Sequence, residues 1–500
     1  MTFQELTTIA PFVAAVLTAV AIMLVDLAWP DRSAVAVGTA LLGLAITAAL
    51  VIVVGGTGTT THLAFGDTYK VDALTTFLHL LLIAVVALTI VFGPDYLRPR
   101  GLPVAEFATV LVFALTGGML IAAAADLLIL FIALELMVLP GYLLAAYHKS
   151  DAYSTEGAIK YFLLGSFSSA IFLFGLAFVW GMTGTTLTAG VAEELTWIVT
   201  GTSELSPGLS MGLALMTTGV AFKIAAVPFH YWTPDAYQGS PTPVTGYLSV
   251  GPKVGAFALI LRLFADGLYP LAEWWLPVVI VLATLTMTLG NLVALTQDNV
   301  KRMLAYSSIA HTGYMLVGLA AYGAGQIQGL EGLLYYGAAY AFMNLGAFAV
   351  VAALQKRAGV TAQLETFAGL GRREPILGVL MVLFLLSLVG IPPTAGFFAK
   401  AYVILAAVEE GGALTVLAVI AVLNAAAAAF YYLRVVVYMY MREPATTTAP
   451  LRHGRLMWIG LAAATVLTIF LGVFPSTVLE GVADAALALP EIGAAQEALR

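Results

Sequence analysis

Apolar runs of about 20 residues recur along almost the whole chain, and this pattern constrains the fold more than any other feature. A helix needs about 20 apolar residues to cross the hydrocarbon core of a bilayer. We find about fourteen such runs, at approximately 8–29, 34–54, 72–92, 103–124, 127–147, 158–182, 209–229, 242–261, 274–296, 303–322, 330–353, 375–408, 412–441 and 456–475. They predict an all-α polytopic membrane protein with a single membrane domain over residues 1–500, because the loops between them are too short for a soluble domain.

The composition supports this prediction and excludes several other classes of protein. Hydrophobic residues make up 61% of the chain and charged residues only 10%, whereas soluble domains carry about 25% charged residues. Cysteine is absent, which excludes disulfides, thiolate-bound iron–sulfur clusters and Cys-ligated zinc. The net charge is −7 and no basic run is present, so we expect a lipid bilayer and no nucleic acid as a partner.

The distribution of Lys and Arg predicts the orientation in the membrane, because these residues mark cytoplasmic loops. With fourteen spans and the N-terminus outside, thirteen of the 21 Lys and Arg, including Lys301, fall in inside loops. Only three fall outside, namely Lys70, Arg262 and Arg500. We therefore expect a periplasmic N-terminus, a periplasmic segment 193–207 and a cytoplasmic segment 356–373.

Five Lys and Arg side chains fall within the predicted spans, and we consider them together with Glu135. The six residues are Glu135, Lys160, Lys223, Lys253, Lys400 and Arg434. A charge at the centre of a span costs roughly 2.5–3.5 kcal/mol on insertion scales. The alternative to a function is a structural ion pair, or a long side chain that reaches the interface; this alternative stays open for Lys160 and is favoured for Arg434. Glu135, Lys223 and Lys253 sit well inside their spans, which indicates function.

Two spans are interrupted by prolines that lie close to buried lysines. Pro228 removes the helical partner of the Ile224 carbonyl, next to Lys223, and Pro234 follows. In the second span, Pro392 and Pro393 free the carbonyls of Leu388 and Val389, Gly396 loosens the next turn, and Lys400 follows. Paired broken helices point to the transport site of an inverted-repeat transporter, and ordinary proline kinks are the alternative.

The two interrupted spans occupy the same place in an internal repeat. Spans within about 103–261 and about 274–441 form two groups of five, and the fourth span of each is the broken one. Because five is odd, the two copies start on opposite sides of the membrane. The sequence therefore predicts two inverted five-helix repeats, each with a broken helix.

Two histidines, His79 and His311, lie deep within spans. Ligation of a haem by this pair is a remote alternative. We expect His311 to form a hydrogen bond within the helix bundle or to relay a proton.

A carboxylate about 10 Å from a buried ammonium interacts with it by about 1.7 kcal/mol. This interaction changes the proton affinity of the lysine about tenfold. A row of such groups joined by water is a proton path with electrostatic gating.

Several long segments carry a family resemblance. They are PFHYWTPDAYQGSPTPVTGYLSVGPKVGAFALILR (228–262), NVKRMLAYSSIAHTGYMLVG (299–318), GIPPTAGFFAK (390–400) and YFLLGSFSSAIFLFG (161–175). The chain resembles the antiporter-like membrane subunits of respiratory complex I, the NADH-quinone oxidoreductase. Among these it is most similar to subunit N in its bacterial form.

The resemblance implies a proton path through six side chains: Glu135, Lys160, Lys223, Lys253, His311 and Lys400. In the family the glutamate modulates a partner lysine, two lysines lie at the broken helices, and one lies at the centre. The resemblance also implies proton movement from cytoplasm to periplasm across a bacterial inner membrane, driven by reactions on other subunits. NADH, FMN, iron–sulfur clusters and quinone are expected on those subunits, and no cofactor is expected in this chain.

The implied partners are the other membrane subunits of complex I, including a neighbouring antiporter-like subunit. Two alternatives remain open. One is a subunit of a multisubunit cation/proton antiporter, which shares the fold and the lysines. The other is a structural spacer without transport, which the cost of the buried charges argues against.

Overall fold

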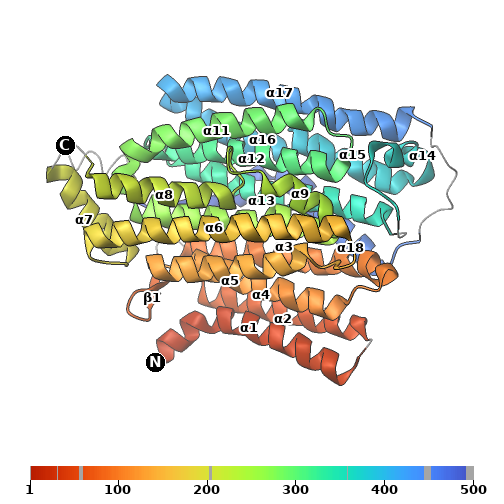
Figure 1. Cartoon of the computed structure of the whole chain (residues 1–500), viewed down its shortest axis with the longest axis horizontal. Helices are drawn as coiled ribbons and strands as arrows, with labels where there is room; N and C mark the ends of the chain where they lie inside the picture. Colours follow the sequence, from red (N-terminus) through yellow and green to blue (C-terminus); the bar gives the residue numbers. More distant parts are fainter. Residues whose placement is uncertain are drawn as a thin grey trace.

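The structure is a computed structural model of the chain, and it describes residues 2–30, 32–55, 60–201, 205–356, 359–443 and 452–490. Residues 202–204, part of the segment predicted to be periplasmic, lie outside the described residues, as do Arg357 and Arg500. Long helices lying side by side dominate the molecule (Figure 1).

The described helices follow one another with short connections. They are α1 (Phe3–Ala28), α2 (Ser33–Val54), α3 (Ala73–Leu97), α4 (Val104–Ala123), α5 (Leu127–Ala145), α6 (Ala152–Thr183), α7 (Thr188–Gly201), α8 (Pro207–Lys223), α9 (Trp232–Gly239), α10 (Thr242–Ile260), α11 (Ala272–Ala294), α12 (Val300–Gly323), α13 (Gln328–Leu354), α14 (Leu370–Arg373), α15 (Pro375–Val389), α16 (Ala395–Glu410), α17 (Gly412–Met441), α18 (Arg455–Val473) and α19 (Pro475–Ala486). Shorter turns are η1 (Arg98–Arg100), the π-helical η2 (Leu261–Gly267), η3 (Tyr269–Leu271) and η4 (Leu364–Phe367).

Eleven of the described helices are long and apolar enough to cross a membrane. They confirm the expected all-α polytopic membrane fold. The prediction of fourteen spans depends on three further regions, namely α12 and the pairs α8–α9 and α15–α16. These regions are shorter or more polar than the eleven, because they contain the breaks and the polar side chains described below. The number fourteen therefore stays a prediction.

The innermost helices are α10, α12 and α13, whose residues are almost all buried by their neighbours. Helices α1 and α2 form one edge of the molecule and α17 lies at the opposite edge (Figure 1). Small residues allow the central helices to approach closely, as is common in membrane bundles. A Cβ at Gly290 of α11 would lie 2.7 Å from the backbone nitrogen of Ala310 in α12, so only glycine fits there.

The two ends of the bundle carry different short elements. Helix α7 and the hairpin strand β1 lie at one end, and α14 lies at the other (Figure 1). The segments predicted to be periplasmic and cytoplasmic thus lie at opposite ends. The hairpin, formed by β1 (His62–Ala64) and β2 (Tyr69–Val71), was not predicted. Its strands have only three residues each, too few to give a recognisable alternation.

Both predicted breaks are present as non-helical segments, residues 224–231 and 390–394. They contain Pro228 in the first case, and Pro392 and Pro393 in the second. The other two residues predicted to contribute to the breaks lie in the first turn of the helix that follows each break. Pro234 is in the first turn of α9, where the missing N–H removes no helical hydrogen bond. Gly396 is in the first turn of α16, where a Cβ would lie 1.8 Å from the Ser387 carbonyl oxygen, so it permits a close backbone contact.

Candidate functional site

Lys223 is the last residue of α8, directly before the first break, and 8% of its surface is exposed. A cation at a helix C-terminus is favoured by the helix dipole. Its Nζ donates to the Ser169 hydroxyl at 2.9 Å and to the Gly165 carbonyl at 3.4 Å. The Ser169 hydroxyl in turn donates to the half-buried Glu135 carboxylate. One hydroxyl on α6 therefore links the predicted glutamate on α5 to its lysine.

Neighbouring side chains satisfy the backbone at the first break. The Ile224 carbonyl accepts a hydrogen bond of 2.9 Å from the Thr312 hydroxyl of α12. The Val227 N–H donates to the Thr286 hydroxyl of α11 at 3.0 Å. Non-helical backbone at membrane depth is tolerated only where protein or water satisfies it, and here hydroxyls from two other helices do so.

Lys253 lies in the middle of α10 and is 5% exposed. Its Nζ donates to both the carbonyl and the hydroxyl oxygen of Ser308 on α12. The ring of Tyr340, from α13, lies with its centroid 5.1 Å from this nitrogen, close enough for a cation–π interaction. Lys253 is thus held by neutral groups from two central helices.

His311 lies one helical turn beyond Ser307 on α12 and is 2% exposed. Its Nδ1 is 2.7 Å from the Tyr336 hydroxyl, and its Nε2 is 3.2 Å from the Tyr432 hydroxyl. The Tyr432 hydroxyl also bonds the Ser307 hydroxyl. Both ring nitrogens therefore have tyrosine partners, which fits the expected hydrogen bonding within the bundle and leaves neither free for a haem iron.

Lys400 lies in the second turn of α16, beside the second break, and is 5% exposed. Its Nζ donates to the carbonyls of Leu388 at 3.1 Å and Val389 at 2.7 Å. These are the two carbonyls that the prolines were expected to free. The lysine therefore replaces the two missing N–H donors at the C-terminus of α15, where the helix dipole also favours a cation.

Lys160 differs from the other lysines because 42% of its side chain is exposed. It lies in the third turn of α6 and forms ion pairs of 2.7 Å with Glu156 and with Asp235 of α9. Asp235 also pairs with Arg302 at 2.7 Å. The structure therefore places Lys160 in a partly exposed ion cluster, apart from the buried lysines.

Two cations that the orientation argument placed in loops are buried in helices instead. Lys301, in the first turn of α12, donates to the carbonyls of Gln238 and Ser240 at the end of α9. Arg262, in η2, has no exposed side-chain surface and forms two hydrogen bonds, of 2.7 and 2.9 Å, with Asp72. The charge and the hydrogen bonds of Arg262 compensate the buried carboxylate of Asp72.

Sequence reasoning also missed the neutral partners of the lysines and of His311. They are Ser169, Ser308, Tyr336 and Tyr432. Hydroxyl side chains are common within membrane helices as interhelical contacts, so no signal in the sequence distinguishes these four. Arg434, by contrast, reaches the end of α11 as expected, donating to the Leu295 carbonyl at 3.3 Å and lying 3.7 Å from Asp298.

A family model shows the class of protein to which this chain belongs. Residues 124–424 match the family described as NADH:quinone oxidoreductase/Mrp antiporter, TM, and the chain belongs to this family of antiporter-like membrane subunits. It is 39% identical to the NADH-quinone oxidoreductase subunit N of Chloroflexus aggregans, over 95% of this chain and 96% of that one. Within the family, the chain therefore belongs among the subunits N of NADH-quinone oxidoreductase.

Solved structures agree with this assignment. A chain of the respiratory complex I of Thermus thermophilus is 32% identical, with a TM-score of 0.77 over 95% of this chain and 99% of that one. A chain of the Mrp complex from Dietzia sp. has a TM-score of 0.79 over 98% of each chain. Its identity is 23%, so this second match shows a shared fold alone.

Proposed function

We propose that the chain is a proton-translocating subunit in the membrane arm of a bacterial NADH-quinone oxidoreductase. Glu135, Lys223, Lys253, His311 and Lys400 carry protons from the cytoplasm to the periplasm in this proposal. The single observation that supports it most is that one buried helix, α12, contacts both breaks and the central lysine. Thr312 bonds the first break, Ser308 bonds Lys253, and the Tyr314 ring lies 4.9 Å from the Nζ of Lys400.

The partners of the central lysines favour proton transfer over a fixed ion pair. Lys253 and Lys400 donate to hydroxyl and carbonyl oxygens. Among the described residues, neither forms an ion pair with a carboxylate. Removing one member of a buried ion pair leaves the other charge uncompensated, at a cost of about 3–5 kcal/mol. Lysines held by neutral oxygens avoid this cost when they lose a proton.

Gating in this proposal is electrostatic. The Ser169 hydroxyl bonds both the Glu135 carboxylate and the Lys223 ammonium. A change in the charge or position of the carboxylate therefore changes the proton affinity of the lysine.

The Tyr340 ring contacts both Lys253 and His311. The Tyr314 ring contacts both Lys400 and His311, so one aromatic ring separates the histidine from each lysine. Steps between groups that do not touch are assigned to water.

The same proposal covers the surroundings of the chain. The two inverted repeats, about 103–261 and about 274–441, place the broken helices α8–α9 and α15–α16 at matching positions. Other membrane subunits, including a neighbouring antiporter-like subunit, are the partners in the inner membrane, and the N-terminus is periplasmic. NADH, FMN, iron–sulfur clusters and quinone bind to other subunits. Lys160 is partly exposed and ion-paired, so in this proposal it lies at the outer end of the proton path.

The alternative is a subunit of a multisubunit cation/proton antiporter, favoured by the fold shared with the Mrp complex. Purification of the native complex from its membrane distinguishes the two functions. Co-migration of this chain with NADH-oxidising activity is the expected result. Sodium-dependent proton exchange in membranes, with no NADH-oxidising activity in the purified complex, would instead favour the antiporter.

A further inference from the structure

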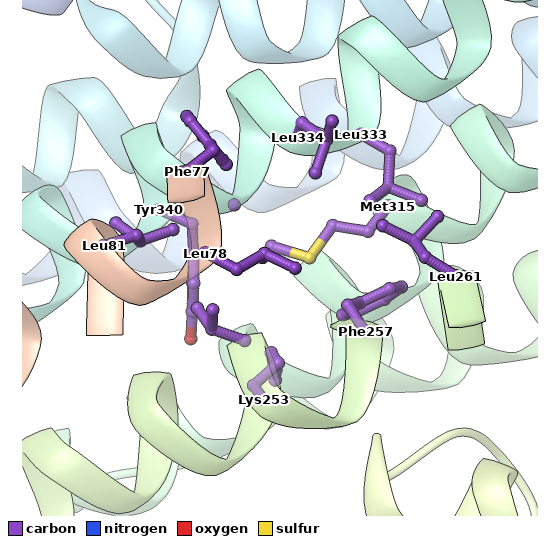
Figure 2. Close-up of a pocket in the computed structure, with 12 residues that line it drawn as sticks. Phe77, Leu78, Leu81, Lys253, Phe257, Leu261, Met315, Leu333, Leu334 and Tyr340 are labelled. Atoms are coloured by element: carbon purple, nitrogen blue, oxygen red, sulfur yellow. The ribbon is translucent and has the colours of Figure 1, made fainter. Parts of the chain in front are cut away.

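The hollows in the described part of the molecule differ in size and in what their walls offer. The cavity beside Lys253 has a volume of about 20 Å³ and an apolar surface (Figure 2), so it holds about one water. A groove of about 490 Å³ lies between α1 and α4, at the edge of the bundle. Its wall is mostly apolar, but it includes Asp26 and Glu106. The groove therefore offers both room and charge.

The groove lies at the end of the bundle that is predicted to be cytoplasmic. Glu5, near the start of α1, accepts a hydrogen bond from the N–H of Phe65 in the hairpin. From Glu5 to Asp26 the helix rises about 32 Å, roughly the thickness of the hydrocarbon core. Glu106 is in the first turn of α4, whose far end meets the hairpin at Ala124. Both carboxylates therefore lie opposite the hairpin, close to one membrane surface.

Neither carboxylate is compensated by a cation within the described part of the chain. Asp26 is half-buried and Glu106 is exposed, and among the described residues neither forms an ion pair. The same wall carries Leu24 and Leu27 of α1, which are 60% and 79% exposed. An occupant that matches this groove is therefore apolar along most of its length and cationic at this end.

A buried hydroxyl gives a second, independent indication of an occupant. Thr109 of α4 lines the groove and is 7% exposed, and its hydroxyl has no hydrogen-bond partner among the residues that the structure describes. Thr8 and Thr18 of α1 and Thr47 of α2 instead donate to the carbonyl four residues earlier. A buried hydroxyl without a partner is costly. A polar group on an occupant would remove this cost, and a lipid chain offers none.

We propose that this groove binds a transmembrane helix of a neighbouring subunit, and that the cytoplasmic end of this helix carries Lys or Arg. Membrane proteins concentrate these residues on the cytoplasmic side, so the cation of the neighbour meets Asp26 and Glu106 at their own level. An anionic lipid headgroup has the same sign as the carboxylates and is repelled. This inference rests on the proposed function, because it takes the neighbour from the membrane arm of the same complex.

Photo-cross-linking from Leu27 identifies the occupant. The photoreactive amino acid p-benzoylphenylalanine, placed at this position, reacts with C–H bonds of protein and of lipid alike. The whole complex is illuminated in its native membrane, and the cross-linked product is identified by mass spectrometry. We expect a cross-link to a helix of another subunit that has Lys or Arg at its cytoplasmic end.

Two pairs of substitutions, made together with the photoreactive residue, test the charges. Asp26→Lys with Glu106→Lys places like charges together and should lower the cross-link yield per inserted chain by about tenfold or more. Asp26→Asn with Glu106→Gln removes only the attraction and should lower the yield about fivefold. Glu193→Gln with Glu194→Gln is the matched control, because both residues are exposed on α7 at the opposite end. It should give the parental yield.

The outcomes separate this inference from the proposed function. A cross-link to lipid alone, or to a helix without Lys or Arg at that end, would overturn the groove as a subunit contact and leave the proposed function standing. A parental yield in the neutral pair would also overturn it, even where the charge-reversed chain does not insert. A basic helix from a complex without NADH-oxidising activity would support the groove and contradict the proposed function.

Discussion

At the scale of single residues, Lys400 donates to the two carbonyls whose helical partners are lost at Pro392 and Pro393. A buried carbonyl without a donor costs about 1–3 kcal/mol, and a buried lysine costs roughly 2.5–3.5 kcal/mol to insert. Each therefore offsets part of the cost of the other. The prolines and the lysine act together, and this relation could be anticipated from the sequence because it is local.

Substitution of Lys400 distinguishes a proton site from a structural donor. In Lys400→Glu a protonated carboxyl can still donate one hydrogen bond and can still exchange a proton, whereas Lys400→Met can do neither. We expect the Glu variant to keep more proton pumping per assembled complex, measured in inverted vesicles. Equal or better pumping by the Met variant would remove Lys400 from the path.

The link between Glu135 and Lys223 depends on the Ser169 hydroxyl. Hydrogen bonds to charged groups contribute about 1.5–3 kcal/mol, so Ser169→Ala should weaken the coupling about tenfold or more and lower pumping. Ser168→Ala is the control, because Ser168 lies on the same helix and bonds the Gly219 carbonyl instead. Equal pumping by the two variants, normalised to assembled complex, would argue against the link.

At the scale of elements, the positions of both breaks follow from proline, but the groups that satisfy them do not. The Ile224 carbonyl is next to Lys223 in the sequence, yet its donor is Thr312, 88 residues away on α12. Such a partner is fixed by the packing of α12 against the break, and the hydropathy of the sequence does not predict that packing. The same limit explains why Arg262 and Lys301 were assigned to loops: both lie at helix ends, and their burial depends on neighbouring helices.

Thr312→Val tests this packing because it removes the hydroxyl while keeping the shape of the side chain. The Ile224 carbonyl would lose its donor, at a cost of about 1–3 kcal/mol. We expect a lower thermal midpoint for the assembled complex, measured in detergent, with Thr312→Ser close to the parent. A midpoint for the Val variant equal to that of the Ser variant would show that the break does not depend on this hydrogen bond.

At the scale of the whole molecule, the sequence predicted the all-helical membrane fold because twenty-residue apolar runs have few other solutions. The uneven distribution of Lys and Arg also assigned the predicted periplasmic and cytoplasmic segments to different ends of the bundle, although two of the counted cations, Arg262 and Lys301, are buried. The missing part is the central network of hydroxyls, which arises only when α10, α12 and α13 pack together. The small β-hairpin was missed for the same reason, since its three-residue strands depend on contacts with the bundle.

Orientation can be measured with single cysteines, because the chain contains none. Thr200 in α7 and Thr361 before η4 are exposed and belong to the segments predicted to be periplasmic and cytoplasmic. A membrane-impermeant thiol reagent applied to intact cells should label Thr200→Cys and not Thr361→Cys. The reverse pattern would overturn the predicted orientation.

Lys223→Ala tests the central claim most directly, because this lysine lies at a helix break and connects to Glu135. Alanine is cheaper than lysine to place in the membrane, so the complex should assemble in normal amount. We expect proton pumping and coupled NADH oxidation, both per assembled complex, to fall well below the parent. Normal pumping by the assembled variant, or absence of the complex from the membrane, would contradict the account and assign Lys223 a structural role or none.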